Sequence, residues 1–321
     1  FSERLGKIGL SVKISGDFSE ASASSRQEKE TILLSSKKAT PIKSKRFVNT
    51  CIQFFDYLFK RTGLEKVLRR IASHIIMTVY PVEIEDLPPE MEGLTIMHLS
   101  DLHIDRNPEL AKTISNKTNN VKVDIVFLTG DYMDHYHANL EEVCFLIKKA
   151  CKNIDSTYGF YAVLGNHDTY NLIPYLSKIG IKTILNATHT VTTHYGDLII
   201  TGIDDSHSFF SPQILEAMDE APTRSENAIR ILLAHSPEAY KWAANRLYQI
   251  YLTGHTHGGQ ICLPGGKAII TGDCERSQIK GKWVYKKMVG LTSPGVGVSG
   301  LTLRLFCPAE IPIYILKTQR S

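Results

Sequence analysis

The stretch YQIYLTGHTHGGQ, residues 248–260, ends an apolar run with two histidines that are separated by one residue. The run 248–252 has the apolar character of a β-strand. On a continuing strand, positions i and i+2 lie on one face about 6 to 7 Å apart, which is too far for two imidazoles to bind one small ion. We therefore expect that the strand ends before His255, or that His255 and His257 serve two different centres. Glycines favour both outcomes, since they let the backbone turn and approach a ligand closely: Gly254, Gly258 and Gly259.

Five similar apolar runs precede this one, and each ends abruptly in polar residues: LTIMHL (94–99), DIVFL (124–128), FYAVL (160–164), LIITG (198–202) and IRILLA (229–234). Helical patterns fall between some of them, at 137–151 and 169–179. Strands that are buried on both faces and interleaved with helices indicate an α/β domain. Functional sites in such domains gather at the strand ends.

Metal-ligand types follow five of these six runs: Asp101, His103, Asp131, Asn166, His235, His255 and His257. A single polar residue after a strand is common, whereas seven in order are hard to attribute to chance. Carboxylate, imidazole and amide oxygen together suit manganese, iron or zinc, while an all-oxygen set would suit magnesium or calcium. Seven ligands are too many for one open catalytic ion, and they suffice for two ions if one carboxylate bridges them.

The series DLH (101–103), GD (130–131), GNHD (165–168), H (235) and GHTH (254–257) resembles the calcineurin-like metallophosphoesterase superfamily over about residues 90–317. This resemblance implies an α/β/β/α fold, a β-sandwich flanked by helices. It also implies that Asp101, His103 and His257 hold one ion and that Asn166, His235 and His255 hold the other. Asp131 would bridge them, so that the two histidines of GHTH serve one ion each.

The resemblance implies a metal-dependent hydrolase in which two ions, about 3.5–4 Å apart, clamp a phosphoryl group and convert a bridging water into hydroxide. Manganese is the expected metal, with iron and zinc as alternatives. His167 would be the acid that stabilises the transition state or protonates the leaving oxygen. Asp168 would orient an imidazole.

Further motifs narrow the resemblance: Leu263-Pro264 after GHTHGGQ, Ser293-Pro294-Gly295, and Cys307-Pro308-Ala309-Glu310. They are similar to those of bacterial phosphodiesterases of lipid A synthesis, above all the chlamydial-type UDP-2,3-diacylglucosamine pyrophosphatases. This similarity implies cleavage of that lipid-linked nucleotide sugar to UMP and 2,3-diacylglucosamine 1-phosphate. Phe209-Phe210 would supply a wall for the acyl chains or a cap on the core. Two alternatives remain open: another lipid-linked or cell-envelope phosphodiester as substrate, and a metal-free scaffold that keeps the fold.

The charge of the 321-residue chain is unevenly placed. Residues 1–70 carry 15 Lys/Arg and 7 Asp/Glu, a net +8, so that residues 71–321 carry 22 and 26, a net −4. An acidic body without a basic, aromatic-studded groove argues against nucleic acid as a partner. The six cysteines show no CxxC pairing, which favours a reduced, cytoplasmic protein.

The N-terminal residues divide by composition into three parts. Residues 1–46, rich in Ser, Lys and Glu, are expected to form a mobile or loosely packed arm. Residues 47–79 show two helical patterns, the second reaching Ile75, with basic residues beside an aromatic face. Such a composition predicts an element that binds an anionic membrane surface at the inner face of the cell membrane, although packing on the body or on a second copy is the alternative. No apolar run reaches the 18 residues of a spanning helix. We expect a linker at Pro81–Pro89, a domain boundary at 80/81 and a catalytic domain over 81–321.

Overall fold

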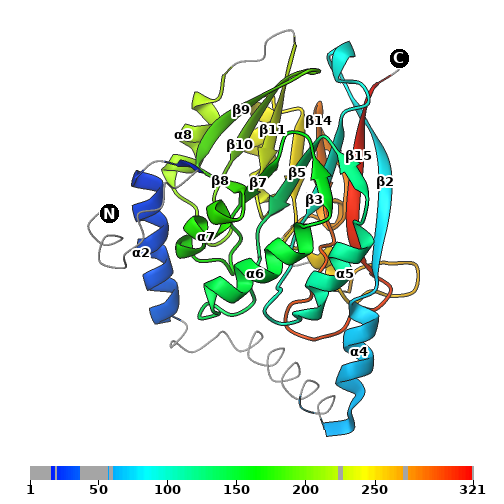
Figure 1. The fold of residues 1–321 in the computed structure, drawn as a ribbon. Coiled ribbons are helices and arrows are strands. Elements are labelled where there is room, and N and C mark those ends of the chain that lie inside the picture. The colour runs from blue at the N-terminus through cyan, green and yellow to red at the C-terminus, as the bar shows by residue number, and fades with distance from the viewer. Residues whose placement is uncertain are drawn as a thin grey trace.

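The structure is a computed structural model, and it describes residues 16–18, 20–36, 57, 61–222, 227–269 and 274–319. Two β-sheets packed face to face form its centre, with helices on both outer faces (Figure 1). The first sheet has the order β1-β8-β7-β5-β3-β15-β2, and the second has the order β13-β14-β12-β11-β10-β9. A short pair, β4-β6, stands apart.

The strands of the first sheet are β1 (Gly16–Phe18), β2 (Ile75–Ile84), β3 (Thr95–Leu99), β5 (Ile125–Thr129), β7 (Phe160–Val163), β8 (Ile181–Leu185) and β15 (Ala309–Thr318). Those of the second are β9 (Ala187–Thr193), β10 (Gly196–Gly202), β11 (Ala228–Leu233), β12 (Ile250–Thr253), β13 (Gly281–Tyr285) and β14 (Met288–Thr292), and the short pair is β4 (Val121–Val123) and β6 (Ile154–Ser156). The helices are α2 (Glu20–Ser36), α4 (Leu64–Ala72), α5 (Glu109–Lys117), α6 (Leu140–Cys151), α7 (Ile173–Lys178), α8 (Pro212–Glu220) and α9 (Tyr240–Asn245).

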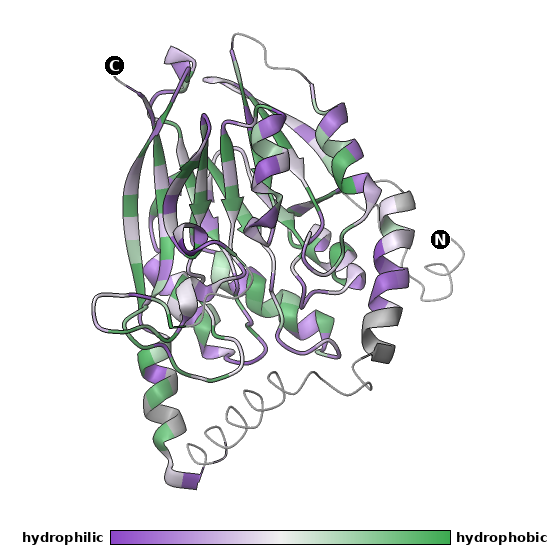
Figure 2. Cartoon of the chain, turned by 180° about the vertical axis from the view of Figure 1, so that it is seen from behind, coloured by the Kyte–Doolittle hydropathy of each residue, from purple (hydrophilic) through white to green (hydrophobic). Residues whose placement is uncertain are grey.

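Three apolar cores hold the layers together. The middle core lies between the sheets, where Phe127 of the first sheet and Ile231 of the second are both buried. A second core packs the outer face of the first sheet against α5, α6 and α7, and a third packs the other sheet against α8 and α9. Figure 2 shows the hydrophobic residues concentrated on the strands in the middle of the molecule. This arrangement confirms the predicted α/β/β/α fold.

Each of the six apolar runs of the sequence becomes a strand, namely β3, β5, β7, β10, β11 and β12. The pattern at 137–151 contains α6, and that at 169–179 contains a 3₁₀ turn (Tyr170–Leu172) followed by α7. Strand β12 ends at Thr253, before the two histidines. The strand therefore ends first, as one of the two expectations for GHTH required.

The structure around residues 72–84 differs from the predicted linker and domain boundary. Helix α4 ends at Ala72, and Ile75 begins β2, which pairs in parallel with β15 as far as Ile84. Pro81 thus lies inside a strand and not in a linker, and the first sheet crosses the expected boundary at 80/81. Proline is tolerated there because β2 is an edge strand. Of the first of the two helical patterns predicted within 47–79, residues 47–56 and 58–60 lie outside the described part of the chain.

Part of the predicted loose arm is also ordered against the body. Residues 16–18 form β1, which pairs with β8 at the edge of the first sheet. Helix α2 follows, and its Ser22, Ala23, Arg26 and Glu30 are buried. The polar composition misled the prediction because some of these polar side chains bind partners in the body. Residues 1–15 and 37–46 lie outside the described part of the chain.

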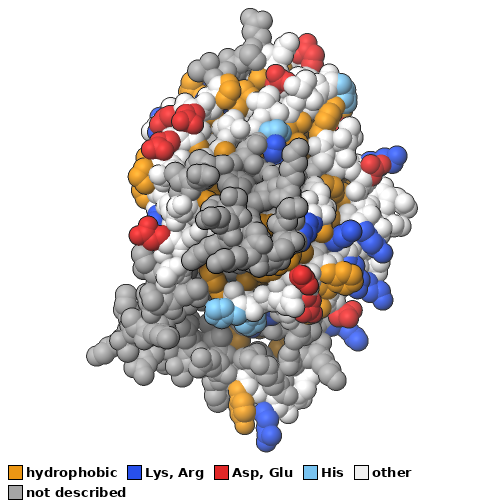
Figure 3. Space-filling model, turned by 60° about the vertical axis from the view of Figure 1, so that its left-hand side comes forward, with side chains coloured by type: hydrophobic (Ala, Val, Ile, Leu, Met, Phe, Trp, Pro, Cys, Tyr) orange, Lys and Arg blue, Asp and Glu red, His pale blue; other side chains and the backbone are white. Residues whose placement is uncertain are grey.

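The described part of the face in Figure 3 carries acidic and basic side chains interspersed with hydrophobic ones. In the described ranges, no helix is both long enough and apolar enough to cross a bilayer.

Candidate metal centre

The seven predicted ligands lie in the loops that follow β3, β5, β7, β11 and β12, at one end of the sandwich. Five of them have a positive φ: Asp101 (53°), His103 (40°), Asp131 (54°), His255 (68°) and His257 (49°). Residues other than glycine rarely adopt this backbone conformation. Strained backbone of this kind is found most often at functional sites. The backbone therefore turns sharply after β3, β5 and β12, where these five side chains enter the cluster.

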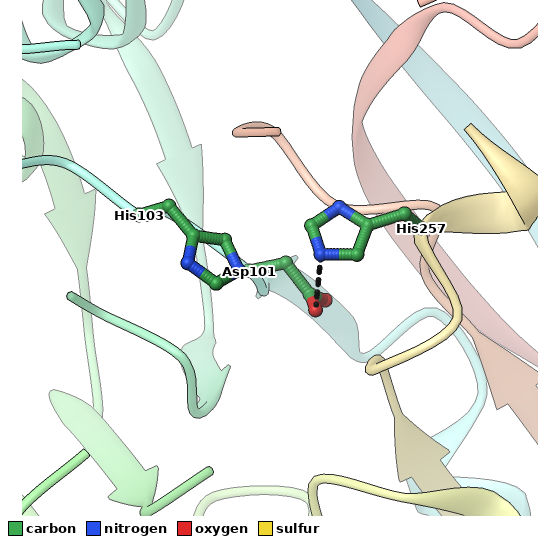
Figure 4. A group of neighbouring side chains, drawn as sticks. All are labelled: Asp101, His103 and His257. Atoms are coloured by element: carbon green, nitrogen blue, oxygen red, sulfur yellow. Dashed lines mark ion pairs between the residues drawn. The ribbon is translucent and has the colours of Figure 1, made fainter. Parts of the chain in front are cut away.

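Asp101, His103 and His257 form one half of the cluster (Figure 4). Their ligand atoms all lie within 4.8 Å of one another. His257 Nε2 lies 3.4 Å from Asp101 Oδ1, and the rings of His103 and His257 stack with their centroids 5.1 Å apart. All three side chains are buried, and they offer one carboxylate and two imidazoles to a common point.

Asn166, His235 and His255 form the other half. His255 Nδ1 lies 3.0 Å from Asn166 Oδ1 and 3.2 Å from His235 Nε2. Asp131 lies between the halves, because its Oδ2 is 3.2 Å from His235 Nε2 and 3.5 Å from His103 Nε2. The structure thus brings all seven residues into one cluster with Asp131 at its centre, and the two histidines of GHTH face different partners.

Two glycines allow the loops to approach the carboxylates this closely. A Cβ on Gly254 would lie 2.3 Å from Asp101 Oδ2, and a Cβ on Gly165 would lie 2.2 Å from Asp131 Oδ1. Both distances are far shorter than ordinary contacts to a Cβ. The glycines of GHTH and GNHD are therefore required by the packing of these loops against the predicted ligands.

The donor set fits divalent ions on chemical grounds. His103 Nε2 is fully buried and has no hydrogen-bond partner among the described residues. Burial lowers the pKa of both His255 and His257, which keeps these imidazoles in the neutral form that binds metals. Burial also opposes a charge on His235, but Asp131 outweighs it and raises that pKa, so the carboxylates attract positive charge into the centre. Buried His/Asp clusters of this kind are consistent with a two-metal site.

His167 lies at the rim of the cluster and is half-buried. Its backbone N–H donates to Asp131 Oδ1 at 2.9 Å, and its Nδ1 lies 3.0 Å from the carbonyl oxygen of Asp134. A carbonyl only accepts, so Nδ1 carries the proton that bonds it. His167 Nε2 is then left to face a ligand in the centre.

Asp168 does not orient an imidazole, contrary to the prediction. Its carboxylate accepts hydrogen bonds from the backbone N–H groups of Gly165, Asp131 and Tyr132, at 2.7 to 2.8 Å. Gly165 N–H comes from the GNHD turn itself and the other two N–H groups come from the GD loop, so that both carboxylate oxygens bind backbone groups. Burial, together with the Asp131 charge, raises the pKa of Asp168 to about 6. Asp168 therefore ties the GD and GNHD loops together.

Other groups lie against the ring nitrogens of His103 and His235, and the sequence patterns did not indicate them. Asp134 Oδ1 lies 3.3 Å from His103 Nδ1, and its other oxygen accepts from Arg106 at 2.6 Å. His235 Nδ1 lies 2.7 Å from the carbonyl oxygen of Thr129. A carboxylate three residues after a bridging aspartate is a signal that could have indicated Asp134, whereas a backbone carbonyl carries no sequence signal.

Phe209 and Phe210, which were expected to form an acyl-chain wall or a cap on the core, lie in different surroundings. Phe209 is buried at 1 % exposure and stacks under Arg26, whereas Phe210 is exposed and packs near Trp242. Phe209 is therefore a cap on the core, which was the alternative stated for it.

Comparison with known proteins finds a family and several relatives. Residues 94–259 match the model of the calcineurin-like phosphoesterase family. The chain is 29% identical over 270 residues to the uncharacterized metallophosphoesterase YkoQ of Bacillus subtilis, covering 81% of this chain and 95% of YkoQ. It is 26% identical to YkuE, a second uncharacterized metallophosphoesterase of that organism, over 78% of this chain and 88% of YkuE. Among solved structures, the phosphopantetheinyl hydrolase PptH of Mycobacterium tuberculosis aligns with a TM-score of 0.40 and 10% identity, over 64% of this chain and 91% of PptH.

The chain belongs to the calcineurin-like phosphoesterase family. It is a metal-dependent phosphoesterase of that family, which confirms the predicted reaction class.

Proposed function

We propose that this phosphoesterase hydrolyses the pyrophosphate of UDP-2,3-diacylglucosamine, with Asp101, His103 and His257 holding one manganese ion and Asn166, His235 and His255 holding a second. Asp131, which lies between the two halves, would bridge the ions. The observation that carries the proposal is the buried convergence of carboxylates and imidazoles at the strand ends. Five of these residues have a strained backbone conformation, which costs stability and is found most often at functional sites. This strain favours a metal-binding enzyme over a metal-free scaffold.

Two divalent ions held in this way would supply Lewis acidity to the phosphoryl oxygens and lower the pKa of a bound water. The residues of the chain supply the rest of the chemistry. When the P–O bond to the leaving group breaks, the leaving oxygen needs a proton. His167 supplies it from Nε2 when its ring carries both protons, and the ring becomes neutral with the remaining proton on Nδ1, where the hydrogen bond to the Asp134 carbonyl fixes its orientation.

Exposed apolar side chains near the centre support a lipid-linked substrate. Two loops that follow the GHTH turn are joined by hydrogen bonds from Leu305 N to Gln260 O and from Cys262 N to Leu305 O. Their exposed apolar side chains are Leu263, Ile269, Leu305 and Phe306. Apolar groups gathered beside a site are suited to bind acyl chains.

The same end of the molecule suits a membrane surface. Figures 1 and 2 place α4 at this end, and its exposed side chains include Leu64, Ile71 and Arg70. Apolar and basic groups side by side favour an anionic bilayer. We propose that α4 and these loops bring the enzyme to the inner face of the cell membrane, where a diacylated sugar would be found.

The test measures release of UMP from UDP-2,3-diacylglucosamine in detergent, with Mn²⁺ or with a chelator. Bis(4-nitrophenyl) phosphate, which has no acyl chain, serves as a second substrate. We expect Mn²⁺-dependent hydrolysis of both, lost in Asn166→Ala and His235→Ala. His194→Ala, an exposed histidine in the turn between β9 and β10, should retain wild-type activity as the matched control.

The outcomes test the substrate and the two-metal site separately. Cleavage of the soluble diester without release of UMP would discard the lipid substrate and favour another lipid-linked or cell-envelope phosphodiester. Full activity in Asn166→Ala would contradict the two-metal assignment itself.

A further inference from the structure

One arginine of the N-terminal helix α2 is buried inside the catalytic domain. Arg26 is 1% exposed, although its helix is mostly polar and precedes the residues matched by the family model. Burial opposes the charge of its guanidinium, but Asp204 and Glu30 outweigh burial and raise its pKa, so that Arg26 stays charged. A buried charge of this kind must be fully paired, and its partners show where α2 acts.

The backbone partners of Arg26 bracket two predicted site residues. Its Nη2 donates to the carbonyl oxygen of Gly165 at 2.8 Å and to that of Asp168 at 2.7 Å. Asn166, a predicted metal ligand, and His167, the predicted acid, lie between these two carbonyls. The planar guanidinium therefore holds both ends of the GNHD turn from behind.

Glu30, one helical turn later, extends the same contact. Its carboxylate pairs with Arg26 Nε at 3.0 Å, and it accepts from Thr169 Oγ1 at 3.0 Å and from Tyr170 N at 2.7 Å. Arg26 and Glu30 are thus positioned by each other. Together they bind every residue from Gly165 to Tyr170 except Asn166 and His167, which are left to face the centre.

The contact continues through Asp168 to the predicted bridging ligand. Arg26 binds the Asp168 carbonyl, while the Asp168 carboxylate accepts from Asp131 N at 2.7 Å. On its other side Arg26 pairs with the Asp204 carboxylate and stacks over Phe209, 4.0 Å from the ring centroid. Arg26 therefore joins the GNHD loop to the loop after β10, whose His207 ring lies 5.5 Å from that of His255.

We propose that Arg26 is a positioning residue, and that α2 is a working part of the active centre. Arg26 holds Asn166 and His167 in the geometry that hydrolysis requires, through the carbonyls of Gly165 and Asp168. The proposal rests on the phosphoesterase activity proposed above, but not on the identity of its substrate.

The test compares Arg26→Lys and Arg26→Ala with wild type, using bis(4-nitrophenyl) phosphate and saturating Mn²⁺. Lysine keeps the charge beside Asp204 and Glu30 but lacks the planar fork that binds two carbonyls at once. A displacement of about 1 Å at a catalytic group costs about 100-fold in rate. We therefore expect kcat to fall at least 10-fold in Arg26→Lys and about 100-fold in Arg26→Ala, with KM within twofold of wild type. Guanidinium ion at millimolar concentration should restore part of the activity of Arg26→Ala.

The matched control is Arg230→Ala. Arg230 is also a buried arginine that donates to backbone carbonyls and lies over an aromatic ring, that of Tyr248 at 4.4 Å. It contacts none of the predicted ligands in the described structure, so its loss should lower stability and leave kcat unchanged. If Arg26→Ala does not fold, Arg26→Lys decides the matter alone, because wild-type kcat in that variant would overturn the proposal.

Amide hydrogen exchange gives a readout that does not depend on activity. Exchange in the peptide covering 165–170 should rise at least 10-fold in Arg26→Lys and remain unchanged in Arg230→Ala. Unchanged exchange at 165–170 would overturn the positioning role even if the wild-type protein hydrolysed none of the substrates. If wild type hydrolysed none of the substrates, but exchange at 165–170 rose in Arg26→Lys as expected, the result would count against the proposed function and not against the positioning role.

Discussion

Replacing Gly254 with alanine should damage the metal centre more than the fold. The new Cβ would lie 1.9 Å from Ser100 Oγ and 2.3 Å from Asp101 Oδ2. Real Cβ contacts are not found below 3.0 Å, so the Asp101 carboxylate must retreat by roughly 0.7 Å, the difference between 2.3 and 3.0 Å. The backbone of Gly254 cannot move instead without losing its 2.9 Å hydrogen bond to the carbonyl of His235.

The expected magnitude follows from this displacement. Overpacking of this size costs about 1–3 kcal/mol of stability, which a domain of this size survives. Because Asp101 is a predicted ligand, a shift approaching 1 Å should lower kcat/KM by about 100-fold. The Asp101 half of the centre should also lose affinity for its ion, while the half around His255 keeps its own.

The assay combines Mn²⁺ titration calorimetry, kcat/KM on bis(4-nitrophenyl) phosphate, and thermal unfolding. Gly159→Ala is the control, because Gly159 has a positive φ of 87° but open space around its Cβ position. That variant should lose about 1–2 kcal/mol through backbone strain and keep its activity. A Gly254→Ala protein that binds two Mn²⁺ ions and retains wild-type kcat/KM would refute the crowding argument.

Two further predictions concern buried groups near the centre. Burial lowers the pKa of His98 to about 3, against about 6.5 in an unfolded chain, so the neutral ring stabilises the fold above pH 6.5 and this contribution is lost as the pH falls toward 3. Relative to His98→Asn, wild type should therefore lose about 2–3 kcal/mol between pH 7 and pH 4.5 in urea unfolding, and a difference that stays constant with pH would contradict this. Asp134→Asn should weaken Mn²⁺ binding by about 10–100-fold, because Asp134 orients His103, with kcat retained at saturating metal; unchanged affinity would mean that the 3.3 Å contact has no effect on the ligand.

The arrangement of the sheets and the cluster could be predicted from local patterns. Each predicted ligand lies within four residues of the end of a mostly apolar strand, so identifying the strand also locates the ligand. The positive φ at Asp131 or His257 was not predictable, because neither residue type requires it. Gly165 and Gly254, which lie directly before Asn166 and His255, were a local sign that the backbone comes close to the carboxylates of Asp131 and Asp101.

The N-terminal third was harder to predict for a physical reason. Strand β2 is stabilised by pairing with β15, more than 200 residues later, and nothing in the proline-bearing segment indicates that partner. In the same way, Arg26 binds residues 139 and 178 positions away. Composition describes the average environment of a segment, whereas one face of α2, with Ser22, Ala23, Arg26 and Glu30, is buried.

Another buried arginine, Arg304, lies beside the half of the centre that contains His257. Arg304 donates to the carbonyls of Pro294 at 2.7 Å and Gly297 at 2.6 Å, and to that of His257 at 3.3 Å. Loops with left-handed turns leave carbonyls without regular partners, and a buried carbonyl without a partner is costly. A guanidinium satisfies several carbonyls at once from a fixed plane. Arg304 binds carbonyls at and near His257, as Arg26 binds the carbonyls that flank Asn166 and His167, so each of these two ligand loops is held by a buried guanidinium. The centre therefore depends on residues on either side of the span matched by the family model, 94–259, and not only on its ligands.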